Sequence, residues 1–453
     1  MKKLILLFCF LSFTSVIFAQ VSKTVNLATA GTLSTSLTSS ELATITNLTI
    51  TGTMDARDFK TIRDDMPLIE ALDLSGGTIS AYNGTEGTST SRNDYPADAI
   101  PDYAFLNSIT RLGKIDLTTI VFPSSLSSIG IYAFTGCGRL TNVKIPSSVA
   151  IIGEHAFADC NDLTTVTIPS SVTSIEKYTF FHCSGLSNVK IPSSVTSIGA
   201  CAFSFCSGLT TVTIPSSVTS IRDEAFTASN GLITVDSNNP NYSSLDGVLY
   251  NKSRTVLIHC PTSKIESFII PSSVTSIGNA AFNGCRGLTT VTIPSSVASI
   301  GASAFVNCNG LTSIITSSIT PIDLSESYGV FDSFKTSSTL YVPLGSKSAY
   351  QAAFRWKDFA NIVEKDFTGI DPIISDQPLN VYPNPTTGKV KLVFKQIPQM
   401  GSTLTVNDFT GKTILTQFIQ NKEEEVDLGG NSPGVYLIRT NMKDFKIQKV
   451  ILK

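Results

Sequence analysis

Apolar and polar positions follow a unit of 23 residues that recurs through the middle of the chain. Each unit carries the block IPSSV, or FPSSL in one case. The proline of each block marks its position: Pro123, Pro146, Pro169, Pro192, Pro215, Pro271 and Pro294. Successive prolines lie 23 residues apart, except for a step of 56 after Pro215, which equals one unit of 23 and one of 33. A fixed period of this length is typical of stacked repeats.

Within a unit, the apolar residues keep fixed places, as in Leu163, Val166, Ile168, Val172, Ile175, Phe180 and Cys183. So few inward residues cannot close a core alone, and each unit must bury them against its neighbours. The portion L-x-x-V-x-I predicts a short strand, which proline ends because it cannot donate to a ladder. The pattern therefore predicts a β-rich repeat solenoid with a parallel sheet.

The strand motif extends beyond the proline-marked units. Its first apolar residues are Ile45, Ile69, Leu112, Leu140, Leu163, Leu186, Leu209, Leu232, Ile265, Leu288 and Leu311, and a degenerate copy ends at Leu340 and Val342. We therefore expect about twelve coils, which would stack to a length of about 50 to 60 Å.

The ends of such an array need caps, because the last coils would otherwise expose apolar faces. Thr38-x-x-Glu41 fits a capping box, and residues 58–66 suggest a second helix. At the other end, residues 346–359 show a helical apolar face that includes Trp356, so we expect this tryptophan in the core of the cap rather than in a ligand platform.

The two ends of the chain differ from the array. Residues 1–19 have the basic start, apolar run and small final residue of a secretory signal peptide, with cleavage expected after Ala19. No later stretch has the roughly 18 apolar residues of a membrane helix. Residues 366–378 are punctuated by Gly and Pro and predict a linker, after which period-2 segments predict a small all-β sandwich.

Residues 379–453 resemble the C-terminal sorting domain of type IX secretion substrates. The likeness rests on LNVYPNPTTG (379–388), DFTGK (408–412) and the ending PGVYLIRTNMKDFKIQKVILK (433–453), with the motif residues Tyr382, Pro383, Asn384, Pro385, Gly388, Gly411, Gly434, Tyr436 and Lys449. The resemblance implies recognition by the type IX machinery, passage through the periplasm and outer membrane, removal of this domain, and either anchoring or release.

The repeat unit IPSSVTSIGxxAFxxCxxLTTVT resembles the leucine-rich repeat of the BspA-like type, over about residues 33–365. That resemblance implies a secreted or surface protein, often an adhesin. The resulting division is a signal peptide (1–19), an N-terminal capping region with divergent repeats (20–120), the array (121–345, with a hairpin insertion at about 236–262), a helical cap (346–365), a linker (366–378) and the sorting domain (379–453).

Composition argues against several kinds of function. The net charge is −2 and charged residues make up only 15% of the chain, so neither nucleic acid nor an anionic membrane is an expected partner. Three His and one Trp leave little material for catalysis or metal binding, and we expect no enzyme, cofactor or metal. Instead, 58 Ser and 53 Thr make up about a quarter of the chain.

The cysteines offer the most tempting chemical signal. Cys137, Cys160, Cys183, Cys206, Cys285 and Cys308 fall in one column of the repeat. Their Cβ vectors would be parallel, which disfavours disulfide geometry, and we expect a buried ladder of thiols. Cys201 and Cys260 lie outside the column, and the sequence leaves open whether they pair. His155 and His182 fall in different columns, which favours surface histidines over a Cys/His nucleophile.

Two other features resemble sites. The segment 236–241 (DSNNPN) is rich in oxygen ligands but lacks the Gly and Glu of a calcium loop, so we expect a turn before a hairpin at Leu245–Val248 that projects from the surface. Glu154 and Lys177 share a column and should form an exposed ion pair.

The outward side of the predicted sheet is the main candidate for binding. Its residues, together with two tyrosines that flank the hairpin, are Asn142, Lys144, Thr165, Thr167, Asn188, Lys190, Thr211, Thr213, Tyr242, Tyr250, Thr290 and Thr292. We expect a monomer that binds a host protein, a glycan or a neighbouring cell there. The alternatives are a structural surface component with no specific ligand and, since T-x-T columns can match an ordered water lattice, ice binding, which Lys144 and Lys190 disfavour.

Overall fold

The computed structural model describes residues 20–366, 379–394, 402–408, 412–440 and 448–453. The chain divides into two compact units, Met1–Lys365 and Asp366–Lys453. The predicted signal peptide, its cleavage after Ala19 and nearly all of the predicted linker lie outside the described residues, as does Gly411.

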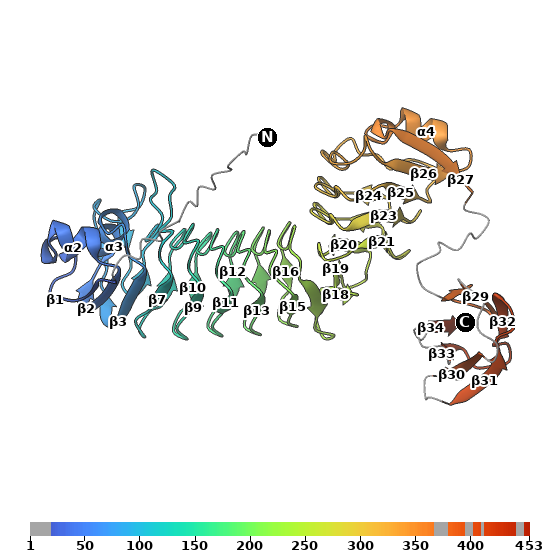
Figure 1. The fold of residues 1–453 in the computed structure, drawn as a ribbon, viewed down its shortest axis with the longest axis horizontal. Helices are drawn as coiled ribbons and strands as arrows, with labels where there is room; N and C mark the ends of the chain where they lie inside the picture. Colours follow the sequence, from blue (N-terminus) through green and yellow to red (C-terminus); the bar gives the residue numbers. More distant parts are fainter. Residues whose placement is uncertain (1–19, 367–378, 395–401, 409–411, 441–447) are drawn as a thin grey trace, which may run out of the picture. The chain divides into compact units, whose positions relative to one another are not determined.

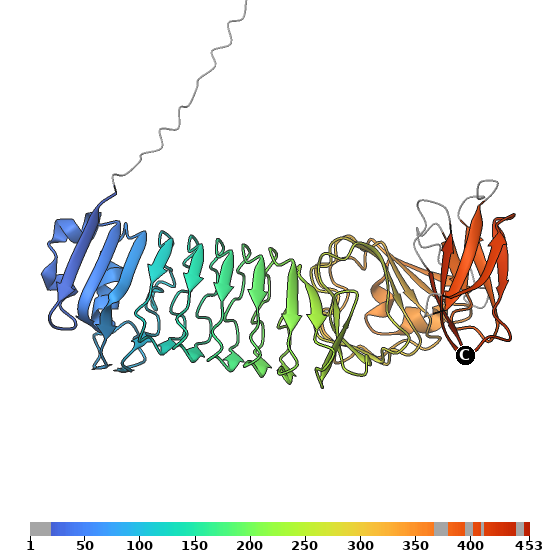
Figure 2. The same ribbon diagram turned by 90° about the horizontal axis from the view of Figure 1, so that it is seen from below.

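The first unit is a solenoid whose main wall consists of parallel strands, one from each coil (Figures 1 and 2). Nine strands form the first sheet in chain order: β1 (Ser22–Leu27), β2 (Asn47–Met54), β3 (Ala71–Ile79), β7 (Thr119–Val121), β9 (Asn142–Lys144), β11 (Thr165–Thr167), β13 (Asn188–Lys190), β15 (Thr211–Ile214) and β17 (Leu232–Val235). Five more continue in a second sheet: β21 (Glu266–Ile269), β23 (Leu288–Ile293), β25 (Ser313–Thr316), β26 (Thr339–Pro343) and β27 (Asn361–Lys365). The predicted β-rich solenoid with a parallel sheet is confirmed, and the described chain adds β1 and β27 to the twelve expected coils.

Short strands form a second wall of the solenoid. They are β6 (Ala99–Ile100), β8 (Ser128–Ile129), β10 (Ile151–Ile152), β12 (Ser174–Ile175), β14 (Ser197–Ile198), β16 (Ser220–Ile221), β20 (Val256–His259), β22 (Ser276–Ile277) and β24 (Ser299–Ile300). A small antiparallel pair, β4 (Tyr82–Asn83) and β5 (Asp94–Tyr95), stands apart from both walls.

The segment that follows each short strand makes a third ladder, which the sequence pattern did not predict. In this segment a positive φ recurs at every fourth residue, as at His155 (φ 56°) and Asp159 (φ 58°). Every second N–H points toward the next coil, so that Phe157 N donates to Thr179 O at 2.9 Å and Asp159 N to Phe181 O at 2.8 Å. Non-glycine residues adopt this conformation at a cost. We infer that the regular hydrogen bonds between coils offset that cost.

Stacked columns of identical side chains fill the solenoid. Phe105, Phe134, Phe157, Phe180, Phe203 and Phe226 stack with ring centroids 4.9 to 5.7 Å apart. A second column, which contains Phe282, Phe305 and Phe331, continues in a separate core cluster. The core is thus divided in two at the long repeat unit.

At three coils the observed strand register differs from the one that the sequence motif predicts. Leu112 and Ile115 are 71% and 61% exposed, because the strand of that coil is β7 and its buried Ile120 pairs with Leu72. Leu232 is 40% exposed, since Ile233 rather than Leu232 continues the inward column from Val212. Ile265 is also exposed, because a bulge in β21 shifts the register there.

The hairpin prediction was correct in its turn and wrong in its location. β18 (Tyr242–Leu245) and β19 (Val248–Asn251) are antiparallel, and the turn residues Asp246 and Gly247 have the positive φ of a tight hairpin. The hairpin does not project from the surface, however. Val248, Leu249 and Tyr250 are buried, and β19 pairs with β20 in the second wall of the solenoid. Leu249 belongs to the first core cluster and Tyr250 to the second, so the insertion joins the two cores.

Helices close both ends of the solenoid. At the start lie α1 (Leu33–Ser36), α2 (Ser39–Thr44), which has the predicted capping box between Thr38 and Glu41, and α3 (Ala56–Asp65). At the end, α4 (Lys347–Ala352) and the 3₁₀ helix η1 (Trp356–Asp358) bring Trp356 into the core, where its Nε1 donates to Ile322 O at 2.8 Å. The tryptophan is therefore a cap residue, as expected.

The second unit contains two antiparallel sheets. One has β28 (Leu379–Tyr382), β29 (Lys389–Phe394) and β32 (Glu423–Asp427). The other has β31 (Thr413–Phe418), β30 (Thr403–Asp408), β33 (Gly434–Thr440) and β34 (Gln448–Leu452). One hydrophobic cluster, which includes Leu392, Val406 and Ile438, draws on both sheets, as the predicted all-β domain requires.

Candidate functional site

The outward side of β7 to β17, called the array face from here on, carries two stripes of side chains in register. The first stripe is Thr119, Asn142, Thr165, Asn188, Thr211 and Leu232, and the second is Val121, Lys144, Thr167, Lys190, Thr213 and Thr234. All twelve residues are exposed. The strand register therefore brings the eight face residues predicted between 142 and 213 together on one surface.

Most hydroxyl groups beside the array face are used by the fold. Just before each strand from β7 to β15, a Thr or Ser hydroxyl donates to the carbonyl of the preceding coil, as from Thr164 to Thr141 O at 3.2 Å. After the strand, the second Ser of the IPSSV block does the same, as from Ser194 to Val172 O at 2.7 Å. These corner hydroxyls satisfy backbone groups that the strands leave free, which explains much of the Ser and Thr content.

The array-face side chains are used differently. Thr165 donates to Asn142 Oδ1 at 2.7 Å, but Lys144, Thr167 and Lys190 have no side-chain partner among the described residues. These groups remain available to a ligand.

The other predicted binding residues do not join this surface. Thr290 and Thr292 lie on β23 of the second sheet and are half-buried. Tyr242 accepts a hydrogen bond from Ile221 N at 2.7 Å, while Tyr250 is 1% exposed. Tyr250 is thus a core residue, and its assignment to a binding surface is corrected.

In the segment 236–241, which was compared with a calcium loop, the Asn239 side chain is hydrogen-bonded to backbone groups. Asn239 is buried, its Nδ2 donates to Pro215 O and Val218 O, and its Oδ1 accepts from the backbone of Asn241 and Tyr242. It takes the place of the corner serine in this coil. Among the described residues, no group of three or more His, Cys, Asp or Glu side chains is arranged to hold a metal ion.

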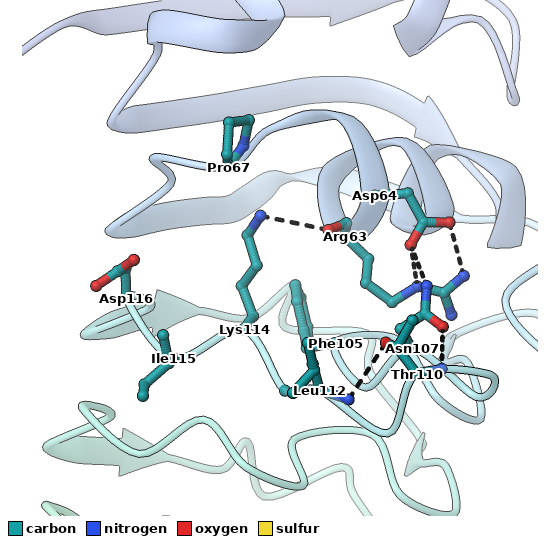
Figure 3. Close-up of a pocket in the computed structure, with 11 residues that line it drawn as sticks. Arg63, Asp64, Pro67, Phe105, Asn107, Thr110, Leu112, Lys114, Ile115 and Asp116 are labelled. Carbon is teal, nitrogen blue, oxygen red and sulfur yellow. Dashed lines mark hydrogen bonds and ion pairs between the residues drawn. The ribbon is translucent and has the colours of Figure 1, made fainter.

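A cavity of about 310 Å³ lies between α3 and the segment that leads to β7 (Figure 3). Arg63 and Asp64 extend into it from the helix, and Leu112, Lys114 and Ile115 come from the facing segment. Leu112 and Ile115, the exposed apolar residues of the motif whose register was predicted wrongly, therefore line this cavity.

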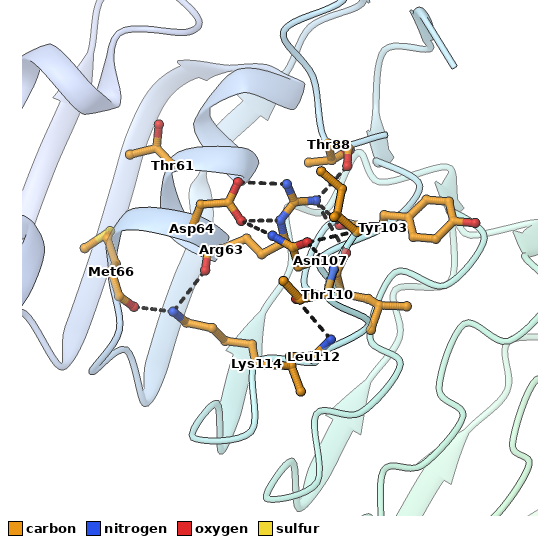
Figure 4. Close-up of polar contacts among 12 residues, drawn as sticks. Thr61, Arg63, Asp64, Met66, Thr88, Tyr103, Asn107, Thr110, Leu112 and Lys114 are labelled. Atoms are coloured by element: carbon orange, nitrogen blue, oxygen red, sulfur yellow. Dashed lines mark hydrogen bonds and ion pairs between the residues drawn. The ribbon is translucent and has the colours of Figure 1, made fainter. Parts of the chain in front are cut away.

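The charged groups of this cavity serve to hold the N-terminal cap together (Figure 4). Arg63 pairs with Asp64 at 2.8 Å and donates to Thr88 O and Tyr103 O. Lys114 is 8% exposed and its Nζ donates to Arg63 O and Met66 O, at the end of α3. Burial lowers the pKa of Lys114 to about 8. The lysine therefore caps a helix C-terminus.

Sequence reasoning did not find these cap residues or His259, because their partners are distant backbone groups and no local spacing marks them. His259 is 3% exposed, and its Nε2 has no hydrogen-bond partner among the described residues. Burial lowers its pKa to about 3.

All eight described cysteines are free and buried. Cys183 Sγ donates to Phe157 O of the preceding coil at 3.1 Å, and Cys160, Cys206 and Cys308 repeat the contact. Burial raises the pKa of Cys137 and Cys206 to about 12, so these thiols do not supply thiolates at neutral pH.

The histidines near the thiol column have partners of their own. His155 stacks between Tyr132 and Tyr178 with centroids 4.4 Å from each, and burial lowers its pKa. His182 Nδ1 lies 2.8 Å from Asp159 Oδ1. Glu154 and Lys177 form the predicted ion pair at 3.0 Å.

In the second unit, the YPNP segment is bound to the last strand. Asn384 Nδ2 donates to Lys449 O at 2.6 Å, and Asn384 Oδ1 accepts from Ile451 N at 2.9 Å. Thr386 exchanges backbone hydrogen bonds with Ile451 and Lys453. Tyr436 is buried and donates to Ser432 O, Gly388 accepts from Leu428 N, and Gly434 begins β33. Pro383 and Pro385 are exposed and follow cis peptide bonds.

The repeats match the family model of the BspA type leucine rich repeat region in six copies, over residues 98–233 and 259–370. These matches cover more than half of the chain. The chain belongs to the BspA-type leucine-rich repeat family. Residues 380–453 match the secretion system C-terminal sorting domain.

Solved structures of bacterial leucine-rich repeat proteins resemble the chain. A leucine-rich repeat protein from Eubacterium ventriosum is 27% identical over 55% of this chain and 72% of its own, with a TM-score of 0.43. A leucine rich cell surface protein from Faecalibacterium prausnitzii is 29% identical over 60% of this chain and 84% of its own, with a TM-score of 0.42. No curated protein matches the chain significantly.

The sorting domain marks this BspA-type protein for export to the cell surface by type IX secretion. Repeats of this family are non-enzymatic scaffolds. Among the described residues, no helix has both the length and the apolar character needed to cross a membrane.

Proposed function

We propose that the exported protein binds an extracellular protein or glycan through the array face, in the manner of an adhesin. One observation carries this proposal. The hydroxyl groups at the corners of the coils donate to backbone carbonyls, whereas Thr167, Lys144 and Lys190 extend from the face with no partner among the described residues. Extended faces of solenoids are their usual binding surfaces.

The alternative is a structural component of the bacterial surface or matrix, with an array face that is only solvated. The regular ladders of hydroxyl groups that bond to neighbouring coils favour this structural role, because they stabilise a rigid stack of coils. The two functions differ in one measurable respect, because only the first requires saturable binding.

The test replaces Thr167 and Thr213 with tyrosine in the full chain and measures capture by immobilised collagen, laminin, dextran and hyaluronan. The bulky rings should block close approach to the array face, while the inward columns are untouched, so any saturable binding should fall at least about tenfold with an unchanged melting temperature. Ala150→Tyr with Thr173→Tyr, at exposed positions outside the face strands, is the matched control. Absence of saturable wild-type binding would favour the structural alternative.

We also propose that the sorting domain is removed on export. Mass spectrometry of the protein at the cell exterior should then find a C-terminus within about 366–379, because the sorting match begins directly after the Gly- and Pro-punctuated segment. A variant with Asn384→Ala, which loses both contacts to β34, should accumulate inside the cell with the domain attached. Intact Lys453 on the exported wild-type protein would contradict removal.

A further inference from the structure

The array face has a charge pattern with a period of two coils. Asn142 and Lys144 on β9 are followed by two threonines on β11, and the same alternation repeats with Asn188 and Lys190 on β13 and two threonines on β15. The strand register places Lys144, Thr167 and Lys190 side by side in one stripe. Parallel strands lie about 4.8 Å apart, so the two lysines are about 9 to 10 Å apart along the array.

The stretch around these lysines is free of carboxylates. None of the twelve array-face residues on β7 to β17 is acidic. The nearest acidic residue in the same stripe is Asp73 on β3, two coils before Lys144, and its Oδ1 accepts from Ser75 N. Asp116 and Asp162 stand at turns before the strands, and Asp116 is paired with Arg139 at 3.2 Å.

The two lysines are also unpaired, in contrast to Lys23, Lys177 and Lys335 of the same unit. Lys177 pairs with Glu154 and Lys23 with Glu41, whereas Lys144 and Lys190 have no ion pair with any described residue. At physiological ionic strength charges are screened over about 8 Å, so each of these lysines can contact a separate anionic group with little mutual repulsion.

We propose that the array face takes a linear anionic polysaccharide that lies along the array, with one acidic group at each lysine. This inference rests on the proposed function and names its ligand class. Each lysine meets a carboxylate or sulfate group, and the hydroxyl and amide groups of Thr167 and Asn188 contact the sugar hydroxyls between them. An extended disaccharide has a length comparable to two strand spacings, so a polymer with one acid in each disaccharide fits this period without bending. A folded acidic protein has no such repeat along a line.

The test measures binding of the full chain to hyaluronan, which has one carboxylate per disaccharide, to chondroitin sulfate, and to uncharged dextran. We expect saturable binding to both anionic polymers that weakens as salt rises, and none to dextran. Lys144→Gln with Lys190→Gln should weaken it about tenfold, through loss of two exposed charge contacts. Lys347→Gln with Lys357→Gln, which changes the net charge equally at exposed positions in the C-terminal cap, should leave it unchanged.

A second variant tests the spacing at constant composition. Lys144→Thr with Thr167→Lys keeps the net charge and moves one lysine to the coil beside Lys190, so hyaluronan binding should fall several-fold. Unchanged binding in this variant, or failure of the wild type to bind either anionic polymer, would overturn the inference. If collagen, laminin or dextran still binds and the Thr167→Tyr and Thr213→Tyr variant weakens that binding, the proposed function stands and only the ligand class is wrong.

Discussion

Replacing Phe180 with alanine is expected to destabilise the first core by about 3 to 5 kcal/mol. The ring is fully buried and stacks between Phe157 and Phe203, with centroids 5.7 and 5.4 Å away. A regular stack cannot collapse into the gap, because the coils on either side are held apart by their strand ladders. Circular dichroism during urea unfolding measures the loss.

The control for this variant is Phe354→Ala, which removes a ring that is 53% exposed in the C-terminal cap and should cost under about 1 kcal/mol. Since repeats interact mainly with their neighbours, Phe180→Ala should also broaden the transition by uncoupling the coils on its two sides. A loss equal to that of the control would show that the phenylalanine column does not carry the stability of the array.

Acid is expected to destabilise the second core through His259. Its folded pKa of about 3 lies below the value of about 6.5 in an unfolded chain. The unfolded state therefore binds the proton more readily between these values, and the stabilisation, complete above about pH 6.5, is lost as pH falls toward 3. From pH 7 to pH 4.5 the loss amounts to about 2 to 3 kcal/mol.

His259→Leu isolates this effect from the titration of carboxylates, which both proteins share. The fluorescence of Trp356 reports on the right region, because this single tryptophan lies in the same core cluster as Leu257 and Cys260. The variant should match or exceed the wild type at pH 7, since it removes an unpartnered buried nitrogen. The gap between the two proteins should then widen by about 2 to 3 kcal/mol at pH 4.5. If the stabilities of the wild type and the His259→Leu variant changed in parallel with pH, the result would contradict a neutral, buried His259.

The period of 23 residues predicted the inward columns correctly wherever the coils are regular. Val143, Val166, Val189 and Val212 are all buried and pair in register, and the cysteine column is a ladder of buried thiols. The array-face residues of β9 to β15 followed from the same period, because side chains alternate between the two sides of a strand.

The same reasoning failed where a coil departs from the period. Leu112-x-x-Ile115-x-Leu117 has the right residue types, yet the coil uses Leu117, Ile120 and Phe122, and the other two apolar residues face the cavity beside α3. Leu232 was misplaced because the step from Val212 to the inward Ile233 is shorter than a full unit. A local sequence pattern does not reveal such a shift, because only pairing with the neighbouring coil selects among the alternative strand registers.

The sequence by itself determined the solenoid, the columns that fill it, the caps and the sorting domain, because these depend on residue spacing that repeats or on local motifs. The tertiary structure alone decided which hydroxyl groups are used by the fold and which remain free on the array face, and that the hairpin enters the core. It also decided that Lys114, Asn239 and His259 become buried polar residues. Each of these outcomes depends on partners from other coils, and burial and hydrogen bonding between coils are set only when the coils are stacked.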